Sequence, residues 1–402
     1  MATERREPKT RDVSNFPTSG FKTQDEQANY RHLQMVDRQL FLHINWPILA
    51  IVFLLFVAGV LNLYSASAFR IGDGTALTPF YKRQLIWGGI SLLAMITTML
   101  LDYRHLKNSA WFLYLVGIVL LIAVLFWGRT IYGAQRWLDL GLFHFQPSEV
   151  AKIGLVLVAA AFLSRIKHSL GFKDMLKALL IVIVPAYFIA SQPDLGSALL
   201  LVFLMAGMVI YQGIKKNTLK ILLLTLPMLV PLGWFFLKDY QKTRLLTFLN
   251  PGQDPLGSGY HVIQSQIAIG SGRFWGKGFM EGTQSQLRFL PEKHTDFAFS
   301  VLGEEWGFIG SIILLFLFCV FLYQIFLCSA EAKDKFGTML CVGVFFYFFW
   351  QILINIGMVL GLMPVVGVPL PFVSYGGTSL LVNFIMVGLV LNVSMRRFMF
   401  KS

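Results

Sequence analysis

The sequence predicts an all-α polytopic membrane protein with about ten transmembrane helices, and three observations support this fold class. Of the 402 residues, 56% are hydrophobic and only 14% are charged, whereas soluble proteins carry about 25% charged residues. The apolar residues form continuous blocks of about 20, the length that crosses a bilayer as a helix. One long loop, at residues 238–296, separates the seventh block from the eighth.

The chain divides into a polar tail at residues 1–46 and a membrane domain at residues 47–402. The tail contains seven Lys and Arg residues and no apolar run, so we expect a cytoplasmic segment rather than a cleavable signal peptide. Pro193 predicts a tight break between the fifth and sixth helices. The ten predicted spans are residues 47–68, 84–101, 109–127, 148–164, 177–191, 195–213, 219–237, 297–327, 337–360 and 375–395.

The net charge of +13 is explained by membrane topology rather than by nucleic acid binding, because cytoplasmic loops of membrane proteins collect Lys and Arg. Two of the opposite short loops, residues 192–194 and 361–374, contain neither residue. This bias predicts that both termini are cytoplasmic and that residues 238–296 lie outside. The predicted cytoplasmic loops contain Arg104, Lys107, Arg165, Lys167, Lys173, Lys215, Lys216, Lys333 and Lys335.

Asp296 lies where the long outer loop re-enters the membrane, and two interpretations have equal weight. As a general base, its carboxylate would lie among aromatic neighbours, which raise its pKa, and beside Lys293 and His294, which lower it. As a helix N-cap, it would accept main-chain hydrogen bonds at the start of the eighth span. Both roles are compatible if Thr295 makes the cap.

Glu149 and Lys152 follow Pro147, which suits the first turn of a helix. Because they are three residues apart, they share a helix face and can form an ion pair. In one interpretation the pair only neutralises itself at a helix end. In the other, Lys152 faces a polar cavity and binds an anion.

Arg83 and Arg136 lie on the predicted outer side, against the charge bias of the loops. Arginine binds phosphate oxygens through two parallel hydrogen bonds, and an outer arginine can also extend to lipid headgroups. We favour ligand binding for Arg136, which lies beside Gln135 and Trp137. For Arg83 alone we favour contact with lipid.

Other motifs exclude several function classes. The glycine-rich run at residues 270–278 lacks the spacing of a nucleotide-binding phosphate loop and is predicted to face outward. No cluster of His, Cys, Asp or Glu has zinc-binding spacing, and no nucleophile elbow is present. Residues 260–269 are predicted to form a short interfacial helix within the long loop.

Five long motifs resemble the SEDS family (shape, elongation, division, sporulation), and most closely its RodA branch. The resemblance extends from about residue 47 to the C-terminus. The motifs are GAQRWLDLGLFHFQPSEVAK at 133–152, QPDLGSALL at 192–200, DPLGSGYHVIQSQIAIGSGRFWGKG at 254–278, GTQSQLRFLPEKHTDFAFSVLGEEWG at 282–307 and NIGMVLGLMPVVGVPLPFVSYGGTSLL at 355–381.

The resemblance implies a peptidoglycan glycosyltransferase that polymerises lipid II into β-1,4 glycan strands outside the cytoplasmic (inner) membrane during cell elongation. The implied partners are lipid II, the growing lipid-linked glycan chain, membrane lipid, a class B penicillin-binding protein and other membrane proteins of the elongation complex. In this reaction the acceptor 4-hydroxyl attacks the anomeric carbon of the growing chain and releases undecaprenyl pyrophosphate.

The resemblance also implies roles for single residues. The essential loop aspartate of the family falls on Asp296, the expected general base. Its cavity charges fall on Arg136, Glu149 and Lys152, and on Arg83. The cations are expected to stabilise the pyrophosphate, and Glu149 is expected to orient Lys152. No covalent cofactor is expected; a divalent cation, Mg²⁺ or Mn²⁺, can share the pyrophosphate charge, although the sequence contains no dedicated cage for it.

Two other functions fit parts of the pattern. A lipid II flippase would also have many spans, buried charges and helices broken by Pro or Gly. The informative residues here cluster at the outer end rather than at the middle of the membrane, which favours an enzyme. A non-catalytic scaffold for a penicillin-binding protein would not need a desolvated aspartate beside several cations.

Overall fold

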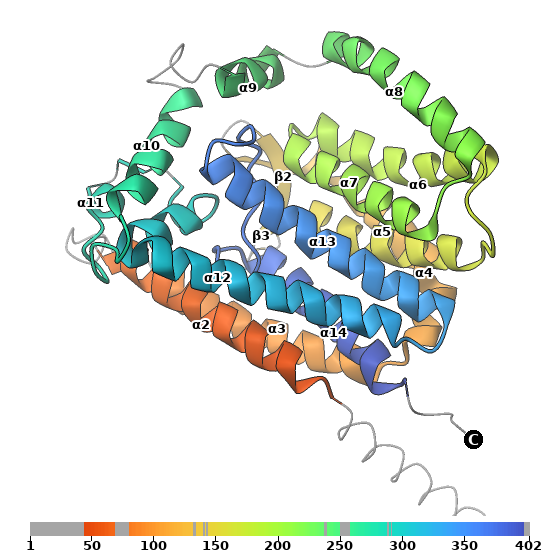
Figure 1. The fold of residues 1–402 in the computed structure, drawn as a ribbon, viewed down its shortest axis with the longest axis horizontal. Helices are drawn as coiled ribbons and strands as arrows, with labels where there is room; N and C mark the ends of the chain where they lie inside the picture. The colour runs from red at the N-terminus through yellow and green to blue at the C-terminus, as the bar shows by residue number, and fades with distance from the viewer. Residues whose placement is uncertain are drawn as a thin grey trace, which may run out of the picture. The chain divides into compact units, whose positions relative to one another are not determined.

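In the computed structural model, the apolar segments of the chain form long helices, which make up most of the structure (Figure 1). It describes residues 44–68, 80–131, 134–139, 141, 144–236, 239–249, 258–287, 289–290 and 292–397; most of the predicted tail lies outside these residues. Nine described helices are long and apolar enough to cross a membrane. They are α2 (Trp46–Ala68), α3 (Phe80–Leu100), α4 (Tyr103–Trp127), α5 (Pro147–Ser164), α6 (Phe172–Ser191), α7 (Leu195–Gln212), α12 (Ala298–Ala330), α13 (Lys335–Val359) and α14 (Gly377–Met395).

These nine helices coincide with nine of the ten predicted spans. The remaining predicted span, residues 219–237, corresponds to α8 (Lys216–Phe236), a helix that contains Pro227 and Pro231 and is not among the nine. The all-α polytopic fold is therefore confirmed. The predicted break at Pro193 is also confirmed, because α6 ends at Ser191 and α7 begins at Leu195.

The core of the bundle is formed by α5, α13 and α14, whose side chains are mostly buried. α5 packs against α4 and α13, and α14 packs against α3. Small residues allow these close contacts: a Cβ added to Gly117 of α4 would lie 3.3 Å from the Cα of Ala151 in α5. A Cβ on Gly377, at the start of α14, would lie 2.3 Å from the Trp87 ring of α3.

A small antiparallel sheet between α4 and α5 was not predicted. It consists of β1 (Arg129–Ile131), β2 (Ala134–Asp139) and β3 (His144–Phe145), in the order β1-β2-β3. In its register, Thr130 is opposite Gln135, and Leu138 is opposite Phe145. The sheet leads directly into α5, so it holds Arg136 close to the N-terminal end of that helix.

The long predicted loop contains three further helices, α9 (Asp239–Leu249), α10 (Ser258–Ser271) and α11 (Thr283–Gln286). The helix predicted at residues 260–269 is confirmed as the central part of α10. α10 packs along α12, and Figure 1 shows α9, α10 and α11 following one another outside the long helices.

α12 is interrupted at Gly307, whose φ of 64° and ψ of −158° are accessible almost only to glycine. The glycine-rich run at residues 270–278 packs against this break and replaces the helical hydrogen bonds lost there. The amides of Lys277 and Gly278 donate to the carbonyls of Glu304 and Glu305, and the amides of Phe308 and Ile309 donate to the carbonyls of Arg273 and Phe274, at 2.9–3.2 Å. The glycines therefore serve close packing of the loop on α12.

Candidate functional site

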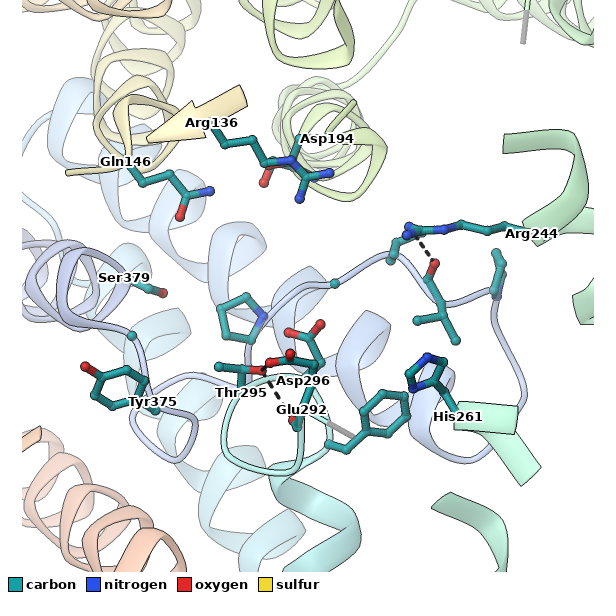
Figure 2. A pocket seen from close by; sticks show the side chains of 18 of the residues that line it. Arg136, Gln146, Asp194, Arg244, His261, Glu292, Thr295, Asp296, Tyr375 and Ser379 are labelled. Atoms are coloured by element: carbon teal, nitrogen blue, oxygen red, sulfur yellow. Dashed lines mark hydrogen bonds and ion pairs between the residues drawn. The ribbon is translucent and has the colours of Figure 1, made fainter. Parts of the chain in front are cut away.

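A cavity of about 650 Å³ brings together segments that are far apart in the sequence (Figure 2). Its walls come from β2, the N-terminal ends of α5 and α7, helices α9 and α10, the turn before α12 and residues 361–379. The charged side chains that line it include Arg136, Glu149, Asp194, Arg244, Glu292 and Asp296. Three of the five predicted site residues, Arg136, Glu149 and Asp296, therefore meet in one cavity.

Asp296 lies in the turn before α12 with its carboxylate in the cavity. The N-cap interpretation is wrong: Phe297 occupies the N-cap position of α12, and no side chain caps the helix. The pKa of Asp296 is raised to about 7, chiefly by burial and further by the neighbouring Glu292 and Asp194, while Arg136 and Arg244 oppose the increase. Such a carboxyl is half ionised at neutral pH, where a general base is most effective.

The residues of the turn before Asp296 make contacts away from its carboxylate, whereas the sequence predicted that Lys293 and His294 lie beside it. Thr295 Oγ1 donates to Glu292 Oε2 at 3.1 Å. The His294 ring stacks on Phe80 at 4.1 Å between centroids, and its carbonyl accepts from the Tyr375 amide at 2.8 Å. Lys293 donates to the Ser285 carbonyl. The charges that lower the pKa of Asp296 are Arg136 and Arg244, rather than Lys293 and His294.

Arg136 is held at the cavity wall by the N-terminal end of α7. Its Nε donates to the Gln192 carbonyl at 3.2 Å, and its Nη2 donates to the Pro193 carbonyl. Its Nη1 lies 3.9 Å from Asp194 Oδ1. These contacts fix the position of the Arg136 side chain. Because the side chain remains 25% exposed, it is still accessible to an anionic ligand in the cavity.

Glu149 and Lys152 form the ion pair that their spacing predicts, with Lys152 Nζ 2.6 Å from Glu149 Oε1. Both side chains are almost fully buried at the start of α5. Glu149 lines the cavity, whereas Lys152 is not among the described residues that line it. Glu149 Oε2 has no hydrogen-bond partner among the described residues, so this buried oxygen can accept a hydrogen bond from a ligand.

Arg83 lies on the first turn of α3 and is exposed. It is not among the described residues that line the cavity. The predicted site residue on α3 is therefore not brought together with Asp296 in this structure.

Sequence reasoning missed several ionisable residues that line the cavity, among them Asp194, Arg244, His261 and Glu292. Asp194 caps α7 by accepting from the Ser197 amide at 3.2 Å, and an acidic residue before a predicted helix is a recognisable cap signal. Arg244 lies in the loop predicted to be outside, so the argument applied to Arg136 also applies to it. It donates from Nη1 to the Val365 carbonyl at 3.2 Å.

His261 lies on α10 with its ring parallel to Phe297, 6.1 Å between centroids. Burial lowers the pKa of His261, Glu292 opposes this, and Arg244 lowers the pKa further. The neutral form of the imidazole is therefore favoured. Its Nδ1 is buried without a partner among the described residues. No local sequence signal distinguished His261 from an ordinary buried histidine.

A metal site made by the protein alone is not present in the described part of the chain, where no three His, Cys, Asp or Glu side chains lie together. The carboxylates of the cavity are instead interspersed with Arg136 and Arg244. Any divalent cation bound here would need further oxygen ligands from a substrate.

Comparisons with known proteins agree with this geometry. The model of the FtsW/RodA/SpoVE family, described as "Cell cycle protein", matches residues 45–398. The chain is 40% identical to the peptidoglycan glycosyltransferase MrdB of Escherichia coli (strain K12), over 88% of this chain and 94% of that protein. It is 31% identical to the peptidoglycan glycosyltransferase RodA of Treponema pallidum (strain Nichols), over 84% and 94%.

Two solved structures are also similar. One is described as "Structural coordination of polymerization and crosslinking by a peptidoglycan synthase complex" and matches with a TM-score of 0.75 at 35% identity, covering 88% of this chain and 98% of that one. The other is the rod shape determining protein RodA of Thermus thermophilus, with a TM-score of 0.65 at 30% identity and the same coverage. This chain therefore belongs to the FtsW/RodA/SpoVE family, which is the SEDS family that its motifs resemble.

Proposed function

We propose that this chain is a peptidoglycan glycosyltransferase that polymerises lipid II into β-1,4-linked glycan strands, with Asp296 as the general base. Membership of the family and the names of the relatives at 40% and 31% identity support the enzyme class. The observation that carries the mechanism is the cavity carboxyl of Asp296, with its pKa raised to about 7 and two arginines nearby.

The proposed step transfers one proton and exchanges one bond. The acceptor sugar's 4-hydroxyl gives its proton to the Asp296 carboxylate, and its oxygen forms a bond to the anomeric carbon of the growing chain. The bond from that carbon to the pyrophosphate oxygen breaks, and undecaprenyl pyrophosphate leaves with the electron pair. Attack from the face opposite the leaving group converts the α-linkage to a β-linkage.

The departing pyrophosphate needs positive charge close to its oxygens. Arg136 and Arg244 are the two arginines at the cavity wall, and their planar guanidinium groups suit phosphate oxygens. Lys152 is proposed to act through its pair with Glu149. Arg83 is proposed to bind lipid headgroups or the approaching substrate. A divalent cation, Mg²⁺ or Mn²⁺, is proposed to be carried by the pyrophosphate.

The chain is a multi-pass membrane protein. We place it in the bacterial inner membrane with both termini cytoplasmic and the cavity on the outer side, on the charge bias of its loops. Similarity to a structure of a peptidoglycan synthase complex supports a class B penicillin-binding protein as partner, together with other membrane proteins of the elongation complex.

The function is tested with purified protein, its penicillin-binding partner, fluorescent lipid II and Mg²⁺ or Mn²⁺, and glycan chains are resolved on a gel. We expect wild type to form chains and Asp296→Asn to be slower by about 10²–10⁴-fold, the usual contribution of a positioned base. Asp139→Asn is the matched control, because Asp139 is an exposed aspartate on β2 paired with Arg129.

Three results would contradict the proposal. Folded Asp296→Asn that polymerises at the wild-type rate would exclude the base assignment. Wild-type protein that moves lipid II between leaflets without forming chains would favour the flippase. A scaffold is favoured if chains form only when the partner's own activity is intact.

A further inference from the structure

Asn355 is a fully buried residue near the C-terminal end of α13, and its side chain joins two walls of the cavity. Its Nδ2 donates to the main-chain carbonyl of Asp296 at 2.9 Å and to that of Val368 at 2.8 Å. A primary amide has two N–H donors, so each donor has one acceptor. One side chain thus connects the turn before α12 with the outer loop before α14.

The two carbonyls belong to the turn before α12 and to the segment of residues 367–368, which lies close to the Asp296 carboxylate. Gly367 precedes Val368, lines the cavity and has a φ of +71°. A Cβ on Gly367 would lie 3.3 Å from Asp296 Oδ2. The Asn355 bridge therefore sets how closely the loop backbone approaches the carboxylate.

Within the part of the chain that the structure describes, the carboxylate makes no side-chain hydrogen bond, and its pKa is determined by burial and by nearby charges. The direction in which the Asp296 carboxylate points therefore depends on the position of the Asp296 main chain. Phe297 caps α12 without a side-chain bond, so the start of the helix alone does not fix the turn. The Asn355 hydrogen bond is the contact that ties the Asp296 main chain to α13.

Asn355 also retains an unfavourable feature. Its Oδ1 is buried without a hydrogen-bond partner among the described residues, which is uncommon for buried polar atoms and calls for an explanation. A leucine of similar size would remove this oxygen. The presence of an amide side chain at position 355 is explained if both of its N–H donors are needed for the hydrogen bonds to Asp296 and Val368.

Resting on the proposed function, we propose that Asn355 is a positioning residue for the general base, which holds the main chain of Asp296 against residues 367–368 and keeps its carboxylate directed into the cavity. It does not touch the substrate. Its effect is on the rate of proton removal and on the environment in which Asp296 ionises.

Asn392 on α14 provides a matched control. It is also fully buried, and its Nδ2 donates to two main-chain carbonyls, those of Thr98 and Leu101 at the C-terminal end of α3. It makes the same kind of bridge in a region that does not line the cavity. Loss of its bridge should weaken the fold without changing how Asp296 ionises.

The test compares Asn355→Leu and Asn392→Leu in thermal unfolding and in polymerisation of lipid II across pH. We expect both to lower Tm. We expect only Asn355→Leu to lower kcat, by roughly 10- to 100-fold as misplacement of a catalytic group does, with little change in KM. Its pH–rate midpoint should also move below the wild-type value, because a released carboxylate gains solvent.

Asn355→Thr, which keeps one donor, is measured as well and should recover part of the lost kcat; it replaces Asn355→Leu if that variant does not fold. Wild-type kcat and pH midpoint in a folded Asn355 variant would overturn the positioning role, as would an equal shift of the midpoint in Asn392→Leu. Asp296→Asn separates the two proposals: if it stays active, the proposed function fails, whereas if it is inactive and the Asn355 variants are normal, only the positioning role fails.

Discussion

Two carboxylates near the N-terminal end of α12, Glu304 and Asp296, have opposite environments. Glu304 is fully buried and accepts from Lys277 Nζ at 2.7 Å and from the amide of Gln284 at 2.9 Å. The Thr283 hydroxyl and the Ser285 amide complete its partners. Asp296 faces a cavity and has two arginines and two carboxylates as its electrostatic neighbours.

The difference shows that burial of a carboxylate does not by itself mark a reactive group. Glu304 uses its oxygens to hold α11 and the glycine-rich run on α12, so these oxygens are not available to a ligand. Asp296 keeps its oxygens free for a ligand and has a pKa raised to about 7. A base must combine restricted solvation with unused acceptor capacity.

The largest expected effect is that of Asp296→Asn on the polymerisation rate. Asp296→Asn should lower polymerisation by about 10²–10⁴-fold without lowering Tm. Because its pKa is raised in the folded state, Asp296 supports folding fully at low pH and loses this contribution as pH rises through about 7. Asp296→Asn should therefore gain stability relative to wild type as pH rises, measured by thermal unfolding between about pH 5 and pH 8. A fall in relative stability over this range would contradict the raised pKa.

Lys152→Met should leave Glu149 buried without its partner, and removal of one member of such a pair costs about 3–5 kcal/mol of stability. The double variant Glu149→Gln/Lys152→Met should recover most of this loss. Polymerisation by the folded double variant then distinguishes the roles of the pair. If the folded double variant has low activity, the ion pair stabilises the negative charge of the departing pyrophosphate. If its turnover equals that of wild type, the pair has only a structural role.

Glu304→Gln should lower the free energy of unfolding by about 1.5–3 kcal/mol, the usual worth of hydrogen bonds to a charged group. Turnover per folded molecule should change far less than in Asp296→Asn, because the side-chain oxygens of Glu304 already accept hydrogen bonds from α11 and Lys277. Tm and specific activity are measured on the same preparation. If Glu304→Gln abolishes activity without affecting Tm, the contrast between the two carboxylates is wrong.

The smallest expected effects are shifts of the pH–rate midpoint in opposite directions. Arg244 lowers the pKa of Asp296 and Glu292 raises it, so Arg244→Gln should move the midpoint up and Glu292→Gln should move it down. Each shift should be less than about one pH unit, because both side chains are partly or fully exposed and their charges are screened. Shifts of the same sign would show that these charges act on another group.

Much of the fold follows from the sequence, because a span is determined by local composition. Each long apolar block became a helix, and Pro193 and Pro147 mark real helix boundaries. The sheet at residues 129–145 was not predicted because two of its strands, β1 and β3, have only three and two residues and the sheet depends on its position beside α5. The break at Gly307 depends on the packing of residues 270–278, which no local pattern reveals.

The candidate site was only partly accessible from the sequence. Arg136, Glu149 and Asp296 were identified because ionisable residues near membrane spans are unusual, and they meet in the cavity. His261 and Asn355 acquire their positions from α10 and α13, and their residue types are common in buried structure. Their relation to Asp296 required the three-dimensional arrangement.

The most direct test of Asp296 as general base is the pH dependence of kcat/KM for lipid II polymerisation by the wild-type enzyme. We predict a rate that rises with pH, reaches half its maximum close to the Asp296 pKa of about 7 and then levels off. We also predict that this titration disappears in Asp296→Asn. A flat profile between about pH 5 and pH 8, or the same midpoint in Asp296→Asn, would contradict the assignment.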